Sequence, residues 1–169
     1  MIYVPKKKPK KATLTTVFSL VIAIVLYVAG ELVGVYKMLF GLPALILISL
    51  GIMVLSRYIL CDHKYVLTGI DSRGAESGFS IIKVSGNREV SLAHFDVISI
   101  YALEHRMGAK AFEEKHGKVD KIYNYCSNLR PTDICSLAIE FNGKKVLFLI
   151  ETDNNFFNAI KKEIAGIEI

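Results

Sequence analysis

The sequence predicts an α+β membrane protein, in which a two-helix transmembrane hairpin precedes a mainly antiparallel seven-stranded β-barrel or sandwich with a C-terminal capping helix. Three observations support this prediction: two long uncharged segments in the first third of the chain, short β-rich runs separated by turn residues, and a final amphipathic segment. Apolar residues make up 52% of the 169 residues and the mean hydropathy is +0.39. These values indicate that part of the apolar surface faces lipid.

The two uncharged segments are residues 12–30 and 38–56, each 19 residues long. As an α-helix, such a segment extends for roughly 28 Å, close to the hydrocarbon thickness of about 30 Å. Lipid penalises an unpaired strand edge so strongly that helices are favoured despite the many β-branched residues. The short connector, residues 31–37, then requires an antiparallel hairpin.

The net charge of +5 comes from a basic tail, residues 1–11. From Arg57 to the end of the chain, 15 basic residues balance 15 acidic ones. A neutral globular part does not attract a phosphate backbone, so nucleic acid is not expected as a partner. The residues expected at the membrane surface, where they set the topology, are Lys6, Lys7, Lys8, Lys10, Lys11, Arg57 and Lys64.

Topology follows from this tail, because positive charge beside a span is retained on the cytoplasmic side. The N-terminus is expected inside the cell, and two crossings return the domain 64–169 to the same side. The expected location is therefore the inner (plasma) membrane of a bacterial cell, as a multi-pass protein. A signal peptide cleaved near Gly30 is the main alternative, although the second span would still hold the protein in the membrane.

Short apolar runs bounded by turn residues predict the strands of the domain. The Asn142-Gly143 pair between two such runs is typical of a type I′ hairpin turn. Residues 104–118 are charged and predict a long loop with one helical turn near 111–115. The expected strands cover residues 65–70, 79–84, 88–92, 97–103, 121–126, 137–141 and 145–150.

The last segment of the chain predicts an amphipathic helix. Thr152-Asp153 supplies a capping residue at its start. The apolar residues that follow share one helical face, and lysines lie towards the other. This apolar face consists of Phe156, Phe157, Ile160 and Ile164.

The domain includes the segments Tyr65-Val-Leu-Thr68 and Val90-Ser-Leu-Ala-His-Phe-Asp-Val-Ile98. Together with the hairpin and the seven strands with a closing helix, these segments resemble the bacterial pleckstrin-homology-like membrane proteins, a mostly uncharacterised group. The resemblance covers roughly residues 64–164 for the domain. It implies a partly open barrel capped by a helix, with a role in binding or scaffolding. Lipid-binding members of the wider group grip inositol phosphates with several basic residues around the first hairpin loop. The only candidates for such a ligand loop are Arg73 and Lys83.

Residues able to carry chemistry are scattered. Cys126 and Cys135 flank a turn, so a disulfide or half of a metal site is conceivable, but a reducing cytoplasm favours free, buried thiols. No phosphate loop, dinucleotide fingerprint or nucleophile elbow occurs, and no catalytic, cofactor-binding or metal-ligating residue is expected. The histidines lack paired metal-ligand spacing and are expected at the surface or at strand edges: His63, His94, His105 and His116.

Three functions are compatible with this organisation. The first is a non-catalytic, membrane-tethered module that recruits a protein partner to the cytoplasmic face. The second is an accessory subunit of a membrane transporter or envelope complex, in which the hairpin itself makes the contact. The third is a membrane enzyme, which requires a polar pocket. The expected partners are the lipid bilayer and a protein, and the sequence leaves open whether the chain forms a homo-oligomer.

Overall fold

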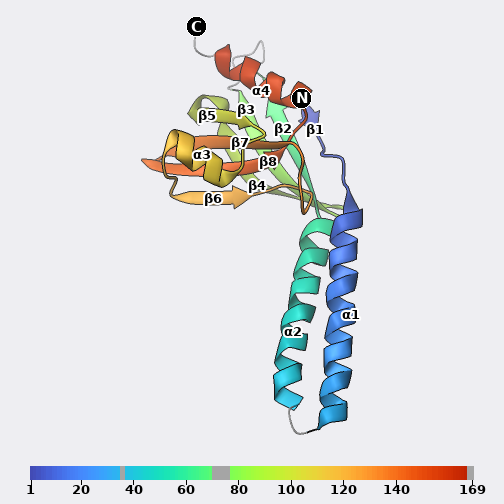
Figure 1. The fold of residues 1–169 in the computed structure, drawn as a ribbon. Helices are drawn as coiled ribbons and strands as arrows, with labels where there is room; N and C mark the ends of the chain where they lie inside the picture. The colour runs from blue at the N-terminus through green and yellow to red at the C-terminus, as the bar shows by residue number, and fades with distance from the viewer. Residues whose placement is uncertain (35–36, 70–76, 167–169) are drawn as a thin grey trace. The chain divides into compact units, whose positions relative to one another are not determined.

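The computed structural model describes residues 1–34, 37–69 and 77–166 (Figure 1). It divides into two compact units. The helical unit contains residues 7–61 and 128–130, and the β-rich unit contains residues 1–6, 62–127 and 131–169.

The helical unit is built from two long helices that lie side by side (Figure 1). Helix α1 spans Pro9–Val33, and helix α2 spans Lys37–Val54 and continues into one π-helical turn, η1, at Leu55–Ile59. Both helices are long and apolar enough to cross a membrane. They contain the uncharged segments predicted from the sequence and extend beyond them, because the flanking polar residues are helical too.

Small residues allow the two helices to approach closely. A Cβ atom added at Gly51 would lie 2.8 Å from Ser19 Oγ, and one added at Gly30 would lie 3.0 Å from the Cβ of Phe40. Both contacts are tighter than ordinary van der Waals contact, so the neighbouring side chain or the helix that carries it would have to move. The side chains buried in this interface are mostly small, among them Ala12, Thr16, Ala23 and Ala44.

The first sheet of the β-rich unit is antiparallel, with the strands in chain order. Its strands are β1 (Ile2–Tyr3), β2 (Asp62–Thr68), β3 (Gly78–Ser85) and β4 (Arg88–Asp96). Strand β1 lies within the tail that the sequence analysis treated as a topology signal alone. Ile2 is opposite Val66 and Tyr3 is opposite Tyr65, so a segment before α1 and a segment after α2 share one sheet.

The second sheet has the strand order β5-β7-β8-β6. A 3₁₀ turn, η2 (Val97–Ser99), precedes its first strand. The hairpin predicted at Asn142-Gly143 is confirmed, since both residues have positive φ values, 51° and 70°. The strands are β5 (Ile100–His105), β6 (Lys121–Asn124), β7 (Ile134–Phe141) and β8 (Lys144–Glu151).

The prediction of one seven-stranded barrel or sandwich was wrong in several details. The described residues form eight strands in two open four-stranded sheets. Strand β6 ends at Asn124 and pairs with β8 in parallel. The predicted strand 97–103 starts only at Ile100, and the predicted loop 104–118 contains a full helix, α3, at Ala109–His116.

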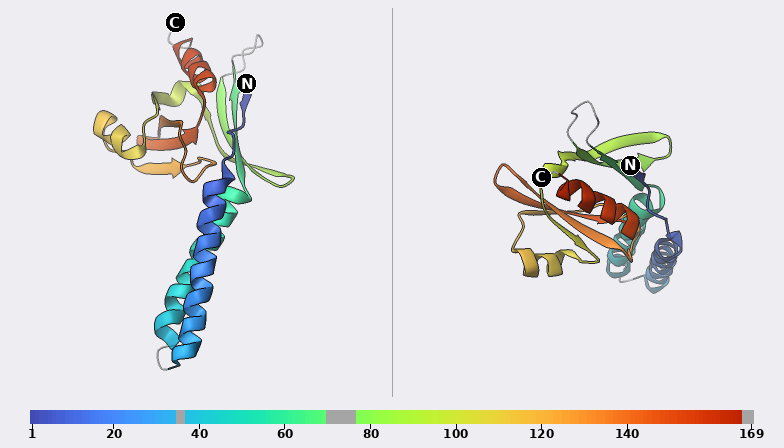
Figure 2. Two further views of the ribbon diagram at one scale, coloured as in Figure 1. Left: turned by 45° about the vertical axis from the view of Figure 1, so that its right-hand side comes forward. Right: turned by 90° about the horizontal axis from the view of Figure 1, so that it is seen from above.

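The main core lies between the two sheets and is closed by helix α4, Asn154–Ala165. Seen from above, α4 covers the space between the sheets (Figure 2). Asp153 caps this helix as predicted, because its carboxylate accepts a hydrogen bond from the backbone N–H of Phe156 at 2.8 Å. A second core lies on the other face of the second sheet, where Phe112 of α3 is fully buried. Burial on both faces explains why β7 is buried continuously from Cys135 to Ile139 rather than in an alternating pattern.

Alkaline pH is expected to destabilise the main core through Cys135. Burial raises the pKa of this thiol from 9.0 to about 12. Between these values the folded chain keeps a proton that the unfolded chain loses, so this contribution is complete below pH 9.0 and disappears as the pH rises towards 12. In this window, the free energy of unfolding of the native chain should fall with pH more steeply than that of Cys135→Ala. The difference between the two slopes should be about 1.4 kcal/mol per pH unit. Urea titrations of both proteins across the window measure the difference, and parallel slopes would contradict the prediction.

Candidate functional site

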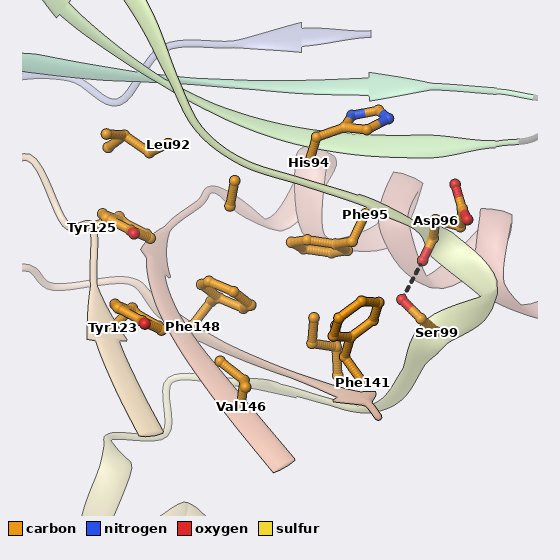
Figure 3. A pocket seen from close by; sticks show the side chains of 12 residues that line it. Leu92, His94, Phe95, Asp96, Ser99, Tyr123, Tyr125, Phe141, Val146 and Phe148 are labelled. Carbon is orange, nitrogen blue, oxygen red and sulfur yellow. Dashed lines mark hydrogen bonds between the residues drawn. The ribbon is translucent and has the colours of Figure 1, made fainter. Parts of the chain in front are cut away.

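A cleft of about 560 Å³ opens in the β-rich unit between strand β4 and the second sheet (Figure 3). This volume lies within the range of about 300–1,000 Å³ that is typical of ligand sites. The lining comes from β4, η2, β6, β7, β8 and the residue after β6. The residues that line it are Leu92, Ala93, His94, Phe95, Asp96, Ser99, Tyr123, Tyr125, Ile139, Phe141, Val146 and Phe148.

Aromatic rings form one wall of the cleft (Figure 3). Phe148 lies at their centre, with its ring 5.3 Å from Phe95, 5.6 Å from Tyr123 and 6.0 Å from Tyr125, measured between centroids. Phe148 is 6% exposed, whereas Tyr123 is 39% exposed. The wall therefore continues from the buried core to the surface, with stacked rings that offer a broad apolar face.

Strand β4 supplies the opposite rim, and a β-bulge shapes it. Ala93 lies opposite Ile81, whereas Ser91 lies opposite Ile82, so Leu92 is an extra residue in the ladder. Figure 3 shows the ring of His94 pointing away from the aromatic side chains. The Nδ1 atom of His94 lies 2.8 Å from the Oγ of Ser80, a residue that does not line the cleft.

The cleft adjoins two sheet edges. Strand β4 is the last strand of the first sheet, and β6 is the last strand of the second. Among the described strands, none pairs with the outer side of β4 or of β6. Both are exposed, so their outer backbone N–H and C=O groups are available to a further strand.

The lining is weakly charged. Within the part of the chain that the structure describes, Asp96 and His94 are its only acidic and imidazole groups, and no lysine or arginine contributes to it. The Ser99 hydroxyl donates a hydrogen bond of 2.6 Å to the backbone carbonyl of Asp96 and fixes the turn after β4. Burial and the neighbouring Tyr123 raise the pKa of Tyr125, so its phenol stays neutral. The cleft therefore suits a neutral, apolar group.

Of the two residues predicted for a ligand loop, Lys83 is described and lies outside the cleft lining. Arg73 is outside the described residues. Lys83 lies on β3, half-buried and opposite His63 and Val90, and it does not line the cleft. Lys64 also lies away from the cleft, where its ammonium is 3.3 Å from the carboxylate of Glu89.

The predicted membrane-surface lysines divide between the two units. Lys6 belongs to the β-rich unit. The Lys7 ammonium donates to the carbonyls of Ile59, at 2.7 Å, and Cys61, at 3.3 Å, and so caps the end of the second helix. Exposed side chains at the ends of the helices belong to Lys8, Lys10, Lys11 and Arg57.

The cysteines and histidines do not assemble a reactive centre in the described residues. Cys126 and Cys135 are buried and form no disulfide, and they belong to cores on opposite faces of the second sheet. The described residues contain no metal-binding cluster of histidine, cysteine and acidic side chains. His94 is exposed on the edge strand, as predicted, whereas His63 is only 6% exposed and contacts Ser127, so the surface prediction for His63 was wrong.

The sequence analysis missed the cleft, because its aromatic residues come from different strands. The one local signal is the Tyr123-x-Tyr125 pair, whose rings are parallel and 6.0 Å apart on one face of an exposed segment. Comparisons with protein-family models, curated proteins and solved structures find no match to this chain.

Proposed function

We propose that this chain is a membrane-tethered, non-catalytic binding module that holds an extended segment of a protein partner in the cleft. The observation that carries the proposal is the aromatic wall beside the unpaired edge of β4. An added strand pairs its backbone with such an edge, and its alternate side chains fill the adjoining pocket. Asp96 and the lack of a described lysine or arginine in the lining disfavour a fatty acid or phospholipid, which carries negative charge.

The two apolar helices support the membrane anchor. The pairing of β1 with β2 supports an even number of crossings, since both strands must lie on the same side of the membrane. The lysine tail favours the cytoplasmic side. The module thus presents its cleft at the cytoplasmic face of a bacterial inner membrane, with both termini inside.

The pleckstrin-homology-like interpretation is part of this proposal. Two stacked sheets and a terminal helix are compatible with it. The parallel pairing of β6 is a departure from the expected mainly antiparallel barrel. In this interpretation, the cleft at β4 does not include Lys83, and Arg73 is outside the described residues.

The test is a selection of peptides from a random library on the full chain in nanodiscs. Selected peptides should carry apolar residues at alternate positions, and methylation of alternate backbone amides should abolish binding. Tyr123→Asp should weaken binding about tenfold or more, because it places a charge against the aromatic wall. The matched control is Ile122→Asp, at an exposed residue on the same strand that does not line the cleft. Peptides without alternation, or equal binding to both variants, would contradict the proposal.

A groove on the helical unit favours the second candidate, an accessory subunit of a membrane complex. It has a volume of about 420 Å³ and is lined by small and apolar side chains: Ala23, Ile24, Tyr27, Gly41, Ala44, Leu45 and Ile48. Such a surface suits a transmembrane helix of a larger complex. Gly41→Leu would fill the groove without meeting other atoms within 4 Å of the added Cβ. If this variant loses the partner while Tyr123→Asp retains it, the accessory-subunit function is favoured.

A further inference from the structure

The helical unit gathers its basic residues, with the exception of Lys37, at one end. Lysines stand at the start of α1, and Arg57 lies in η1, where α2 ends. A further arginine, Arg130, belongs to this unit although it follows β6 in the chain. The exposed members, here called the basic cluster, are Lys8, Lys10, Lys11, Arg57 and Arg130.

A partly buried hydrogen bond brings the segment that contains Arg130 to the start of α1. The backbone N–H of Lys8 donates to Asn128 Oδ1 at 2.6 Å, and Asn128 is 5% exposed. Arg130 follows two residues later with its side chain in solvent. This contact holds the 128–130 segment against the first turn of the helix. It adds the Arg130 cation to the lysines of the tail, from which Arg130 is distant in the sequence.

The basic cluster is not balanced by acids within its unit. In the described part of the helical unit, Glu31 is the only acidic residue, and it lies at the far end of the helices. Its carboxylate is paired there with Lys37 at 2.7 Å. The nearest acids along the chain are Asp62, five residues after Arg57, and Asp133, three residues after Arg130. The Asp133 carboxylate lies 3.1 Å from the guanidinium of Arg106. Five cations against these two acids leave a positive excess.

The position of the basic cluster relative to the apolar segments sets its depth. The uncharged part of α1 begins at Ala12, next to Lys11, and that of α2 ends at Ser56, next to Arg57. The Arg57 guanidinium also lies 5.3 Å from the centroid of the Tyr58 ring, and tyrosine is enriched at the membrane interface. In a bilayer spanned by these helices, the basic cluster lies at the level of the lipid headgroups.

We propose that the basic cluster binds the phosphate of acidic phospholipid headgroups and that Arg130 is one of its ligands. The positive charge of the basic cluster and its depth in the bilayer both identify acidic phospholipid as the ligand, because the inner leaflet is the anionic surface at that level. The proposal rests on the membrane anchor of the proposed function and extends it. One segment of the β-rich part of the sequence thereby contacts lipid, while the aromatic cleft remains a protein site.

The experiment places the full chain in nanodiscs of equal parts phosphatidylglycerol and phosphatidylcholine. After mild detergent extraction, mass spectrometry counts the retained lipids. The wild-type chain should retain phosphatidylglycerol preferentially, and Arg130→Gln should lower the ratio of the two lipids about fivefold, the effect of one charge at the membrane surface. Arg130→Lys should keep the ratio, since it keeps the charge. Arg88→Gln, at an exposed arginine of the β-rich unit, is the matched control and should leave the ratio unchanged.

The outcomes separate this inference from the proposed function. A chain that enters nanodiscs but retains both lipids equally would overturn the headgroup site alone. An unchanged ratio in Arg130→Gln would overturn the assignment of Arg130. A chain that does not enter nanodiscs at all would contradict the membrane anchor and the lipid site together.

Discussion

Replacing Phe156 by alanine should lower the free energy of unfolding of the β-rich unit by about 3–5 kcal/mol, the cost typical of emptying a buried phenylalanine site. Phe156 is fully buried, where α4 closes the main core. Its ring stacks on Tyr3 at 5.0 Å and lies 6.3 Å from the ring of Phe79, so its loss opens a cavity that touches both β1 and β3.

A urea titration of the full chain in mild detergent, followed by near-ultraviolet circular dichroism, measures this change. The chain contains no tryptophan, so the signal reports its tyrosines and phenylalanines. Phe141→Ala is the matched control, because Phe141 is 65% exposed and its replacement should change stability by less than about 0.5 kcal/mol. Equal losses in the two variants would show that α4 does not close the core.

Thiol labelling of intact cells should give an all-or-none difference between the two ends of the hairpin. A cysteine introduced at Leu32, 83% exposed near the end of α1, should react with a membrane-impermeant maleimide from outside. A cysteine introduced at Ile98, 73% exposed in the β-rich unit, should react only after the membrane is opened. The physical reason for this expectation is the proposed retention of the lysine tail on the cytoplasmic side.

The native chain serves as the control for this experiment. Its three cysteines, Cys61, Cys126 and Cys135, are all buried, so background labelling should be low. Labelling of both introduced cysteines from outside, or the reverse order, would refute the topology. Replacing Lys8, Lys10 and Lys11 together by glutamine should yield a mixture of orientations, because it removes much of the charge that retains the tail.

The features that the sequence predicted well are those encoded locally. The helices follow from long uncharged segments, and the β7–β8 hairpin follows from Asn142-Gly143, whose residues favour the left-handed backbone that its turn requires. The cap of α4 follows from Asp153 alone. Each of these signals acts over a few neighbouring residues, so no knowledge of the partner surfaces is needed.

The features that it missed depend on distant partners. Strand β1 is two residues long and exists because β2, beyond both helices, provides its ladder. The parallel direction of β6 leaves no trace in an alternation pattern, which is the same for either direction. Helix α3 is charged, and Phe112 is its one fully buried side chain in the described structure. The cleft likewise joins Phe95, Tyr123 and Phe148 from three strands.

The pairing of β1 with β2 has a consequence for the order of events during synthesis. Ile2 leaves the ribosome before both helices, but its partner Val66 is made only after both helices have been translated. The edge of the first sheet therefore cannot form until the hairpin has been translated. In a membrane that both helices span, a chain whose second helix fails to insert would leave β1 and β2 on opposite sides. In such a membrane, the first sheet is completed only after both helices have inserted. A chain with an inserted first helix and a second helix outside the membrane would keep the edge of β2 unpaired.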